Sequence, residues 1–141
     1  MDIFEHIMKE HREVEGMLER LSEGYDEKVF NELKLSLAAH MRAEEGSLYP
    51  AMKGKEEGMV EHAMEEHRQV DKLLESLSAL SKEGDAFTDA IEELTSVIND
   101  HVMDEEEQMI PRARKLFDEG EIREMSSRFD EVDESITQKA N

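Results

Sequence analysis

The chain has 141 residues, and its 37 Asp and Glu against 17 Lys and Arg give a formal charge of −20, which disfavours nucleic acid and anionic membranes as partners because both would repel it. The absence of cysteine excludes disulfides, thiolate metal sites, thiolate-held iron–sulfur clusters and cysteine nucleophiles. No apolar run is long enough to span a membrane and no signal-peptide pattern opens the sequence, so we expect a single cytoplasmic domain over residues 1–141.

The first predicted helix covers about residues 2 to 22, with Asp2 as its expected N-cap. Apolar residues recur every three or four positions, which is the spacing of one helix face. His11 falls within this stripe, whereas His6 lies off it. The stripe consists of Phe4, Ile7, His11, Val14, Leu18 and Leu21.

The second predicted helix covers about residues 27 to 53 and carries His40 and Glu44 on its apolar stripe. Pro50 should kink or end this helix, because its ring clashes with the preceding turn. Tyr49 is expected to pack in the core rather than to bond a site, because its counterpart in the second half of the chain is an isoleucine. The stripe consists of Phe30, Leu33, Leu37, His40, Glu44 and Leu48.

The third predicted helix, about residues 58 to 81, repeats the first. Residues 3–22 align with residues 59–78 without a gap, and about half of the positions are identical. His62 matches His6, and the stripe residue His67 matches His11.

The fourth predicted helix, about residues 86 to 117, carries His101 and Glu105 on its stripe, and Pro111 is its expected kink. A turn at residues 82–85 separates it from the third helix. A short fifth helix is expected at about residues 121 to 136, where apolar residues again recur at helical spacing.

The chain is therefore an internal duplication, about residues 2–53 and 58–117, of a helical hairpin that has one apolar stripe to bury. Packing two such hairpins together predicts an all-α fold, an antiparallel up-down-up-down four-helix bundle with a short C-terminal helix. The striped histidines and glutamates should then meet near the bundle centre.

A histidine and a glutamate four residues apart differ by only about 40° around the helix axis, so they point the same way. A buried carboxylate costs several kcal/mol unless it is paired, protonated or bound to a cation. Two equal sets of imidazoles and carboxylates suit two borderline metal ions, each held by two histidines, with both carboxylates able to bridge. Iron is favoured, and zinc and manganese are the alternatives. The predicted ligands are His11, His40, Glu44, His67, His101 and Glu105.

The competing interpretation is a set of satisfied core histidines with surface glutamates. His6 and His62 have two interpretations of their own: partly exposed residues at the bundle end, or additional metal ligands brought inward by a helix bulge. If no metal is bound, we expect the pKa of Glu44 and Glu105 to rise through burial and mutual repulsion.

The chain resembles the hemerythrin-like, or HHE cation-binding, family. The resemblance implies a four-helix bundle around a non-haem di-iron centre with an oxo or hydroxo bridge, held by the six predicted ligands, with Glu44 and Glu105 bridging. Family members carry or sense oxygen, handle nitric oxide or peroxide, or supply iron to damaged iron–sulfur clusters. The motifs that carry the resemblance are Glu10-His11-Arg12-Glu13, His40-x-x-x-Glu44-Glu45 with Leu48-Tyr49-Pro50, Glu66-His67-Arg68, and Asp100-His101-x-x-x-Glu105 with Pro111.

The chain departs from the oxygen-carrying hemerythrins at two places. Those proteins have an extra histidine four residues before the third-helix ligand, where this chain has Ala63, and the counterpart of Ala63 in the first helix is Ile7. They also space the fourth-helix pair as His-x-x-x-x-Asp, whereas this chain has His101-x-x-x-Glu105. The pattern is more similar to iron–sulfur repair proteins and iron-sensing domains.

Three functions follow as hypotheses. The first is a di-iron protein that binds or reacts with a small diatomic ligand or peroxide, for sensing, storage or detoxification. The second is an iron-handling or iron–sulfur repair protein, and the third is a metal-stabilised helical interaction module. The sequence assigns no catalytic residue and no protein partner.

Overall fold

The computed structural model describes residues 1–80, 82 and 84–139, and this part of the chain contains helices and no strand. The elements in chain order are α1 (Ile3–Glu23), α2 (Glu27–Glu45), α3 (Leu48–Lys53), α4 (Glu57–Ala79), α5 (Asp85–Asp104), the π-helical turn η1 (Glu105–Met109), α6 (Ile110–Leu116) and α7 (Glu119–Lys139).

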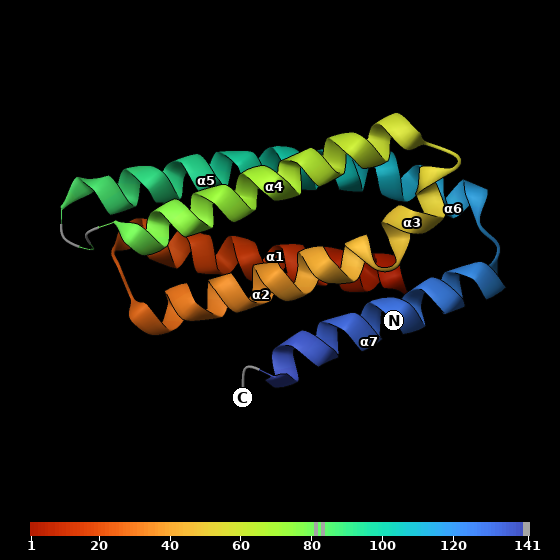
Figure 1. The fold of residues 1–141 in the computed structure, drawn as a ribbon, viewed down its shortest axis with the longest axis horizontal. Coiled ribbons are helices and arrows are strands. Elements are labelled where there is room, and N and C mark those ends of the chain that lie inside the picture. Colours follow the sequence, from red (N-terminus) through yellow and green to blue (C-terminus); the bar gives the residue numbers. More distant parts are fainter. Residues whose placement is uncertain (81, 83, 140–141) are drawn as a thin grey trace.

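The helices α1, α2, α4 and α5 form the bundle (Figure 1). α1 packs against α2 and α4 against α5, and the two hairpins meet where α1 contacts α5 and α2 contacts α4. Helices that follow one another run in opposite directions, because short connections join them. The predicted antiparallel four-helix bundle is confirmed.

Side-chain caps fix where the first two helices begin. The Asp2 carboxylate accepts a hydrogen bond from the backbone N–H of Glu5, and the Glu5 carboxylate accepts one from the backbone N–H of Asp2. This reciprocal pair satisfies two backbone donors that the helix leaves free. Asp26 caps α2 with a single bond: its carboxylate accepts from the backbone N–H of Val29 at 3.1 Å. Of the predicted third helix and the turn after it, residues 81 and 83 lie outside the described part of the chain.

The predicted helix over residues 27–53 is broken earlier than expected, at Gly46 and Ser47. Pro50 does not end the helix but occupies the first turn of α3. The physical reason is that the ring of Pro50 would clash with the carbonyl of Gly46 in a continuous helix. Once the chain restarts at Leu48, the missing N–H of Pro50 costs nothing, because first-turn N–H groups have no intrahelical partner.

The predicted helix over residues 86–117 contains one π-helical turn instead of a simple kink at Pro111. The backbone N–H of Ile110 bonds the carbonyl of Glu105, five residues back, rather than that of Glu106. This wider turn absorbs one residue ahead of the proline ring. Both halves of the chain are thus irregular between the glutamate of the stripe and the proline.

The fifth helix predicted over about residues 121 to 136 is present, and it is longer than expected: α7 has 21 residues, as many as α1. It lies outside the bundle along α2 and also contacts α1 (Figure 1). The Ser126 hydroxyl accepts a hydrogen bond from the backbone N–H of Ile3 at 2.8 Å, and Phe129 is fully buried. α7 therefore covers one side of the first hairpin.

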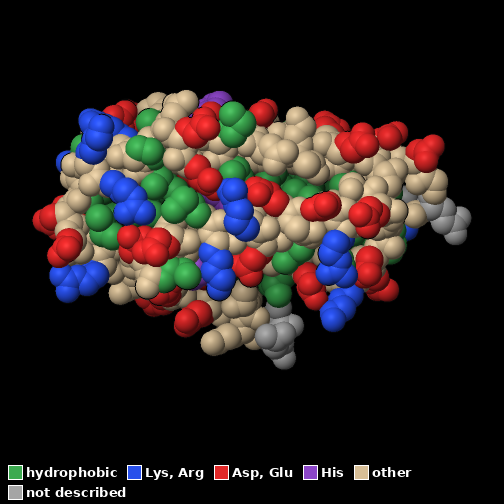
Figure 2. All heavy atoms as spheres, turned by 180° about the vertical axis from the view of Figure 1, so that it is seen from behind, with side chains coloured by type: hydrophobic (Ala, Val, Ile, Leu, Met, Phe, Trp, Pro, Cys, Tyr) green, Lys and Arg blue, Asp and Glu red, His purple; other side chains and the backbone are tan. Residues whose placement is uncertain are grey.

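The apolar core consists of two clusters. One lies towards the connections after α1 and α4 and includes Leu21, Leu33 and Phe87. The other lies towards α3, α6 and α7 and includes Tyr49 and Phe129. Acidic side chains spread over the outside, with basic ones scattered among them, as Figure 2 shows for one face. None of the described helices is long and apolar enough to cross a membrane.

Candidate metal centre

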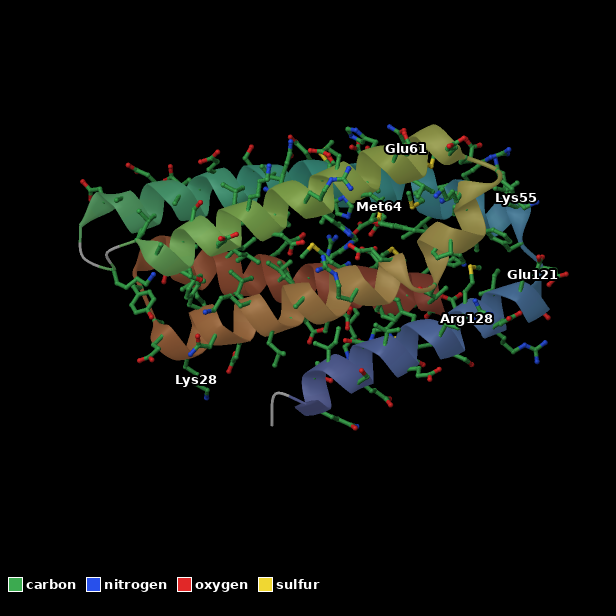
Figure 3. The ribbon with its side chains drawn as sticks, viewed as in Figure 1. Lys28, Lys55, Glu61, Met64, Glu121 and Arg128 are labelled. Atoms are coloured by element: carbon green, nitrogen blue, oxygen red, sulfur yellow. The ribbon has the colours of Figure 1, made fainter. Side chains whose placement is uncertain are left out.

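Six buried polar side chains lie between the two apolar clusters, and the structure brings all six predicted ligands together. Figure 3 shows nitrogen- and oxygen-bearing side chains between the helices in the middle of the bundle. The set consists of His11 from α1, His40 and Glu44 from α2, His67 from α4, His101 from α5 and Glu105 from the start of η1. Helical spacing explains the arrangement, because each of these residues continues the apolar stripe of its own helix.

The six residues form two adjoining groups in which one nitrogen or oxygen from each side chain lies within 4.8 Å of the others. Glu44 belongs to both groups. Its Oε1 atom lies 3.3 Å from Nε2 of His40 and 3.1 Å from Nε2 of His67. The first group is His11, His40, Glu44 and Glu105, and the second is Glu44, His67 and His101.

Glu105 also joins the two halves of the bundle. Its Oε1 atom lies 3.0 Å from Nε2 of His11, and its Oε2 atom lies 3.4 Å from Nε2 of His101. Both carboxylates thus stand between a histidine of the first hairpin and a histidine of the second. This is the position that a bridging ligand of two metal ions requires.

Each of the four histidines also binds a carboxylate through its other ring nitrogen. Such a carboxylate fixes the ring orientation and the tautomer, so that Nε2 faces the centre as an acceptor. Every pair joins two neighbouring helices of the bundle. The Nδ1–carboxylate pairs are His11 with Glu106 at 2.7 Å, His40 with Glu10 at 2.8 Å, His67 with Glu45 at 2.7 Å and His101 with Glu66 at 2.9 Å.

These four outer glutamates were not predicted. The sequence holds a signal for them, because each one is adjacent in the chain to a predicted ligand and recurs in the duplicate. Glu10 precedes His11 as Glu66 precedes His67. They were overlooked because they lie off the apolar stripe, although the carboxylates of Glu10 and Glu66 reach around their helices to the histidine of the next one.

Tyr49 does more than pack, contrary to expectation. Its hydroxyl donates a hydrogen bond to Oε2 of Glu105 at 2.7 Å and lies 3.2 Å from Nε2 of His67. The break after Gly46 turns α3 so that the phenol points back into the centre. The prediction failed because it assumed the symmetry of the duplication, and the counterpart Ile110 has no polar group.

His6 and His62 lie outside the central group. His6 is partly buried and contacts Glu10, Asp130 and Asp133. His62 is exposed, and its Nε2 atom lies 3.3 Å from Oδ2 of Asp104. The bulge that would bring either one inward is absent, because α1 and α4 are regular α-helices over the described residues.

The family model of the hemerythrin HHE cation-binding domain matches residues 2–113. The chain belongs to this family. It is 26% identical over 144 residues to a protein of Nostoc sp. named DNA nickase, a match that covers 99% of this chain and 41% of that protein. The chain thus spans less than half the length of that relative.

Two further comparisons agree with the family. The chain is 28% identical over 138 residues to an uncharacterised hemerythrin-like protein of Schizosaccharomyces pombe, covering 91% of this chain and 67% of that one. The fold is similar to the crystal structure of a hemerythrin HHE cation-binding domain-containing protein from Mycobacterium kansasii. That comparison has a TM-score of 0.80 and 25% identity, and it covers 96% of this chain and 89% of the other.

The residues of this HHE domain fit a metal centre because the protein itself leaves inner atoms unsatisfied. Burying a polar atom without a partner costs about 1–3 kcal/mol, so several such atoms at one place indicate a ligand. Arg12 binds Glu106 and Arg42 binds Glu45, which compensates only two of the six carboxylates around the four imidazoles. The buried atoms without a hydrogen bond at the centre are Nε2 of His11 and His40, Oε2 of Glu44 and Oε1 of Glu105.

In the metal-free protein, the neighbouring carboxylates raise the pKa values of His40, His67 and His101. Burial lowers the pKa of His40, but the negative charge of Glu44 and the hydrogen bond to Glu10 outweigh it and raise that pKa to about 10. The expected rise of the glutamate pKa values is wrong. Burial does raise them, but the imidazolium of His40 brings the pKa of Glu44 well below its ordinary value. The pKa of Glu105 is also lowered, since His101 outweighs burial and the charge of Glu44.

Proposed function

We propose that this chain holds two iron ions between its four bundle helices and that oxygen, nitric oxide or peroxide binds or reacts there, for sensing, storage or detoxification. The observation that carries the proposal is the set of four buried imidazoles whose Nε2 atoms face two shared carboxylates. Nitrogen and oxygen donors of this kind suit borderline divalent ions. Iron is proposed over zinc and manganese because it supplies the redox chemistry that such small molecules require.

The protein side chains have separate tasks in this proposal. His11 and His40 would hold one ion and His67 and His101 the other, and the carboxylates of Glu44 and Glu105 would be shared between the two ions. An iron pair held there would supply the redox chemistry that oxygen, nitric oxide or peroxide requires.

Other side chains prepare the surroundings of the centre. The outer glutamates keep the imidazoles in the metal-binding tautomer and raise their basicity. The hydroxyl of Tyr49 is a hydrogen-bond donor held 2.7 Å from Glu105, and it stays protonated because burial and the two glutamates hold the pKa of Tyr49 well above its ordinary value. Apolar clusters flank the centre on two sides.

A second candidate function is iron handling, in which release of the metal matters more than binding of a small ligand. A pocket that reaches His101 and Glu105 from the surface supports this candidate. The name of the Nostoc relative is not carried over to this chain, because more than half of that protein lies outside the match and a charge of −20 opposes contact with nucleic acid.

The experiment is anaerobic loading of the chain with ferrous iron, followed by exposure to oxygen, nitric oxide or peroxide with the optical spectrum recorded. The wild-type chain should change its near-ultraviolet spectrum with at least one of the three. His40→Ala and His101→Ala should lose bound iron and the spectral change, whereas His6→Ala should keep both. An iron-loaded wild-type chain that is inert to all three molecules contradicts the small-molecule function.

A further inference from the structure

A pocket between α4 and the α5–η1 segment reaches the candidate centre from the surface of the molecule. This pocket has a volume of about 290 Å³. Its inner wall includes the proposed ligands His101 and Glu105, and its outer wall includes His62 and Asp104. Glu66 lies between the two ends.

The corresponding place in the first hairpin is filled. Ile7 is fully buried there, whereas the duplicate position in the second hairpin is Ala63, which lines the pocket. α7 adds Phe129, whose ring lies 4.8 Å from that of His6 and 6.1 Å from that of His40. The side chain on α4 is smaller, and among the described residues α7 packs on the first hairpin rather than over this pocket.

The mouth of the pocket holds three groups of metal-ligand chemistry. Nε2 of His62 lies 3.3 Å from Oδ2 of Asp104 and 3.5 Å from Oε2 of Glu66. The side chains of His62 and Asp104 are 65% and 45% exposed, so they meet solvent directly. The other oxygen of Glu66 accepts from Nδ1 of His101 at 2.9 Å, which connects the mouth to the buried centre through a single side chain.

Asp104, at the mouth of the pocket, has no acidic counterpart in the first half of the chain. His62 and Glu66 match His6 and Glu10, but Asp104 stands where the first half has Ala43. The inner wall of the pocket carries the buried carboxylate of Glu105, whose Oε1 atom lies 3.0 Å from Nε2 of His11 without hydrogen-bond geometry.

We propose that this pocket is the route by which divalent cations reach the centre, and that His62, Glu66 and Asp104 hold the ion on its way. The inference rests on the proposed metal-binding function. An acidic mouth raises the local concentration of cations and speeds their capture. An ion held by His62, Asp104 and Oε2 of Glu66 then passes along the pocket to His101 and Glu105, exchanging imidazole and carboxylate donors for others of the same kind.

The test measures the rate at which the metal-free full-length chain takes up Co²⁺, whose visible absorption changes on binding. Ala63→Ile fills the pocket with the side chain that the first half already has, and it should slow uptake severalfold because it narrows the route without changing any charge. The double variant His62→Ala with Asp104→Asn should slow uptake severalfold and make its rate less sensitive to NaCl. His6→Ala is the matched control and should load at the wild-type rate.

All variants should reach the same final metal content as the wild type, because none of the changes removes one of the six proposed ligands. Release supplies a second measurement on the loaded protein: transfer of Fe²⁺ to bipyridine should be slower in Ala63→Ile. If both Ala63→Ile and the double variant take up Co²⁺ at the wild-type rate, the proposed route is wrong, although the proposed metal centre still stands. A wild-type chain that binds neither Co²⁺ nor Fe²⁺ overturns the proposed function itself.

Discussion

At the scale of single residues, the outer glutamates decide how strongly the imidazoles bind a cation. Glu10 accepts from His40 and Glu66 accepts from His101, and a glutamine would keep an acceptor at the same place while removing the charge. Loss of such an outer partner typically lowers metal affinity about 10–100-fold. Glu10→Gln and Glu66→Gln should each show this loss in a competition titration against a chelator, with unchanged helix content by circular dichroism.

The control is Glu13→Gln, an exposed position on α1, which should bind metal as the wild type does. Equal affinities in all four proteins would show that the outer carboxylates contribute packing alone.

A second prediction at this scale concerns Asp133 on α7. Burial, the hydrogen bond with Glu10 and the negative charge of Glu10 raise the pKa of Asp133 from 3.8 to about 7. Because this folded-state pKa lies above the unfolded value, the folded chain binds the extra proton. The free energy of unfolding contributed by this group therefore falls as the pH rises from about 4 to 7 and stays low above that window.

Asp133→Asn imitates the protonated form, so it should raise the Tm of the metal-free chain by a few degrees at pH 8 and by less at pH 4. Thermal melts across this range measure the difference, and the exposed substitution Glu131→Gln serves as control. An increase in Tm that is the same at pH 4 and pH 8 would mean that the substitution acts through packing rather than through the charge of Asp133.

The meeting of the six inner residues could be predicted from the sequence, since they continue the apolar stripes that face one another in a four-helix bundle. Tyr49 could not be predicted, because its direction depends on the break after Gly46. That break is a property of the backbone rather than of the apolar pattern.

At the scale of elements, the prolines explain where regular helix fails. Pro50 and Pro111 follow Glu44 and Glu105 by six residues in both halves, and each proline forces an irregular turn between itself and the glutamate. The sequence predicts that an irregularity must exist. It does not predict its form, because a break and a π-helical turn relieve the same clash and the neighbouring packing selects between them.

The underestimated length of α7 has a similar cause. The residues that extend α7 before Ile122 and after Ile136 are polar, so they add no stripe from which a helix could be predicted. Capping explains why α7 begins before Ile122. The carboxylate of Asp118 accepts a hydrogen bond from the backbone N–H of Glu121 at 2.8 Å, and the carboxylate of Glu121 accepts one from the backbone N–H of Asp118 at 3.0 Å.

The attachment of α7 to the bundle depends on Phe129, which is fully buried. Phe129→Ala should lower the free energy of unfolding by about 3–5 kcal/mol, because it leaves a cavity against α1 and α2. Denaturant unfolding measures this, with Glu131→Ala on the exposed face of α7 expected to stay within about 0.5 kcal/mol of the wild type. A loss below about 1 kcal/mol would mean that α7 contributes little to the fold.

At the scale of the whole molecule, the excess of acidic residues extends to the candidate metal centre. A chain of charge −20 gathers six carboxylates around four buried imidazoles, which are more acidic groups than four imidazoles could balance. Two divalent cations would satisfy the orphan atoms and the excess negative charge at once. The loaded chain is therefore expected to be more stable than the metal-free chain, because a ligand that binds only the folded state stabilises it.

The central claim is that the duplicated ligands hold two metal ions per chain. The most direct measurement is an anaerobic equilibrium titration of the metal-free chain with Fe²⁺, with bound and free iron separated by dialysis. The account predicts saturation at two ions per chain. Saturation at one ion or fewer would contradict the shared centre built from Glu44 and Glu105.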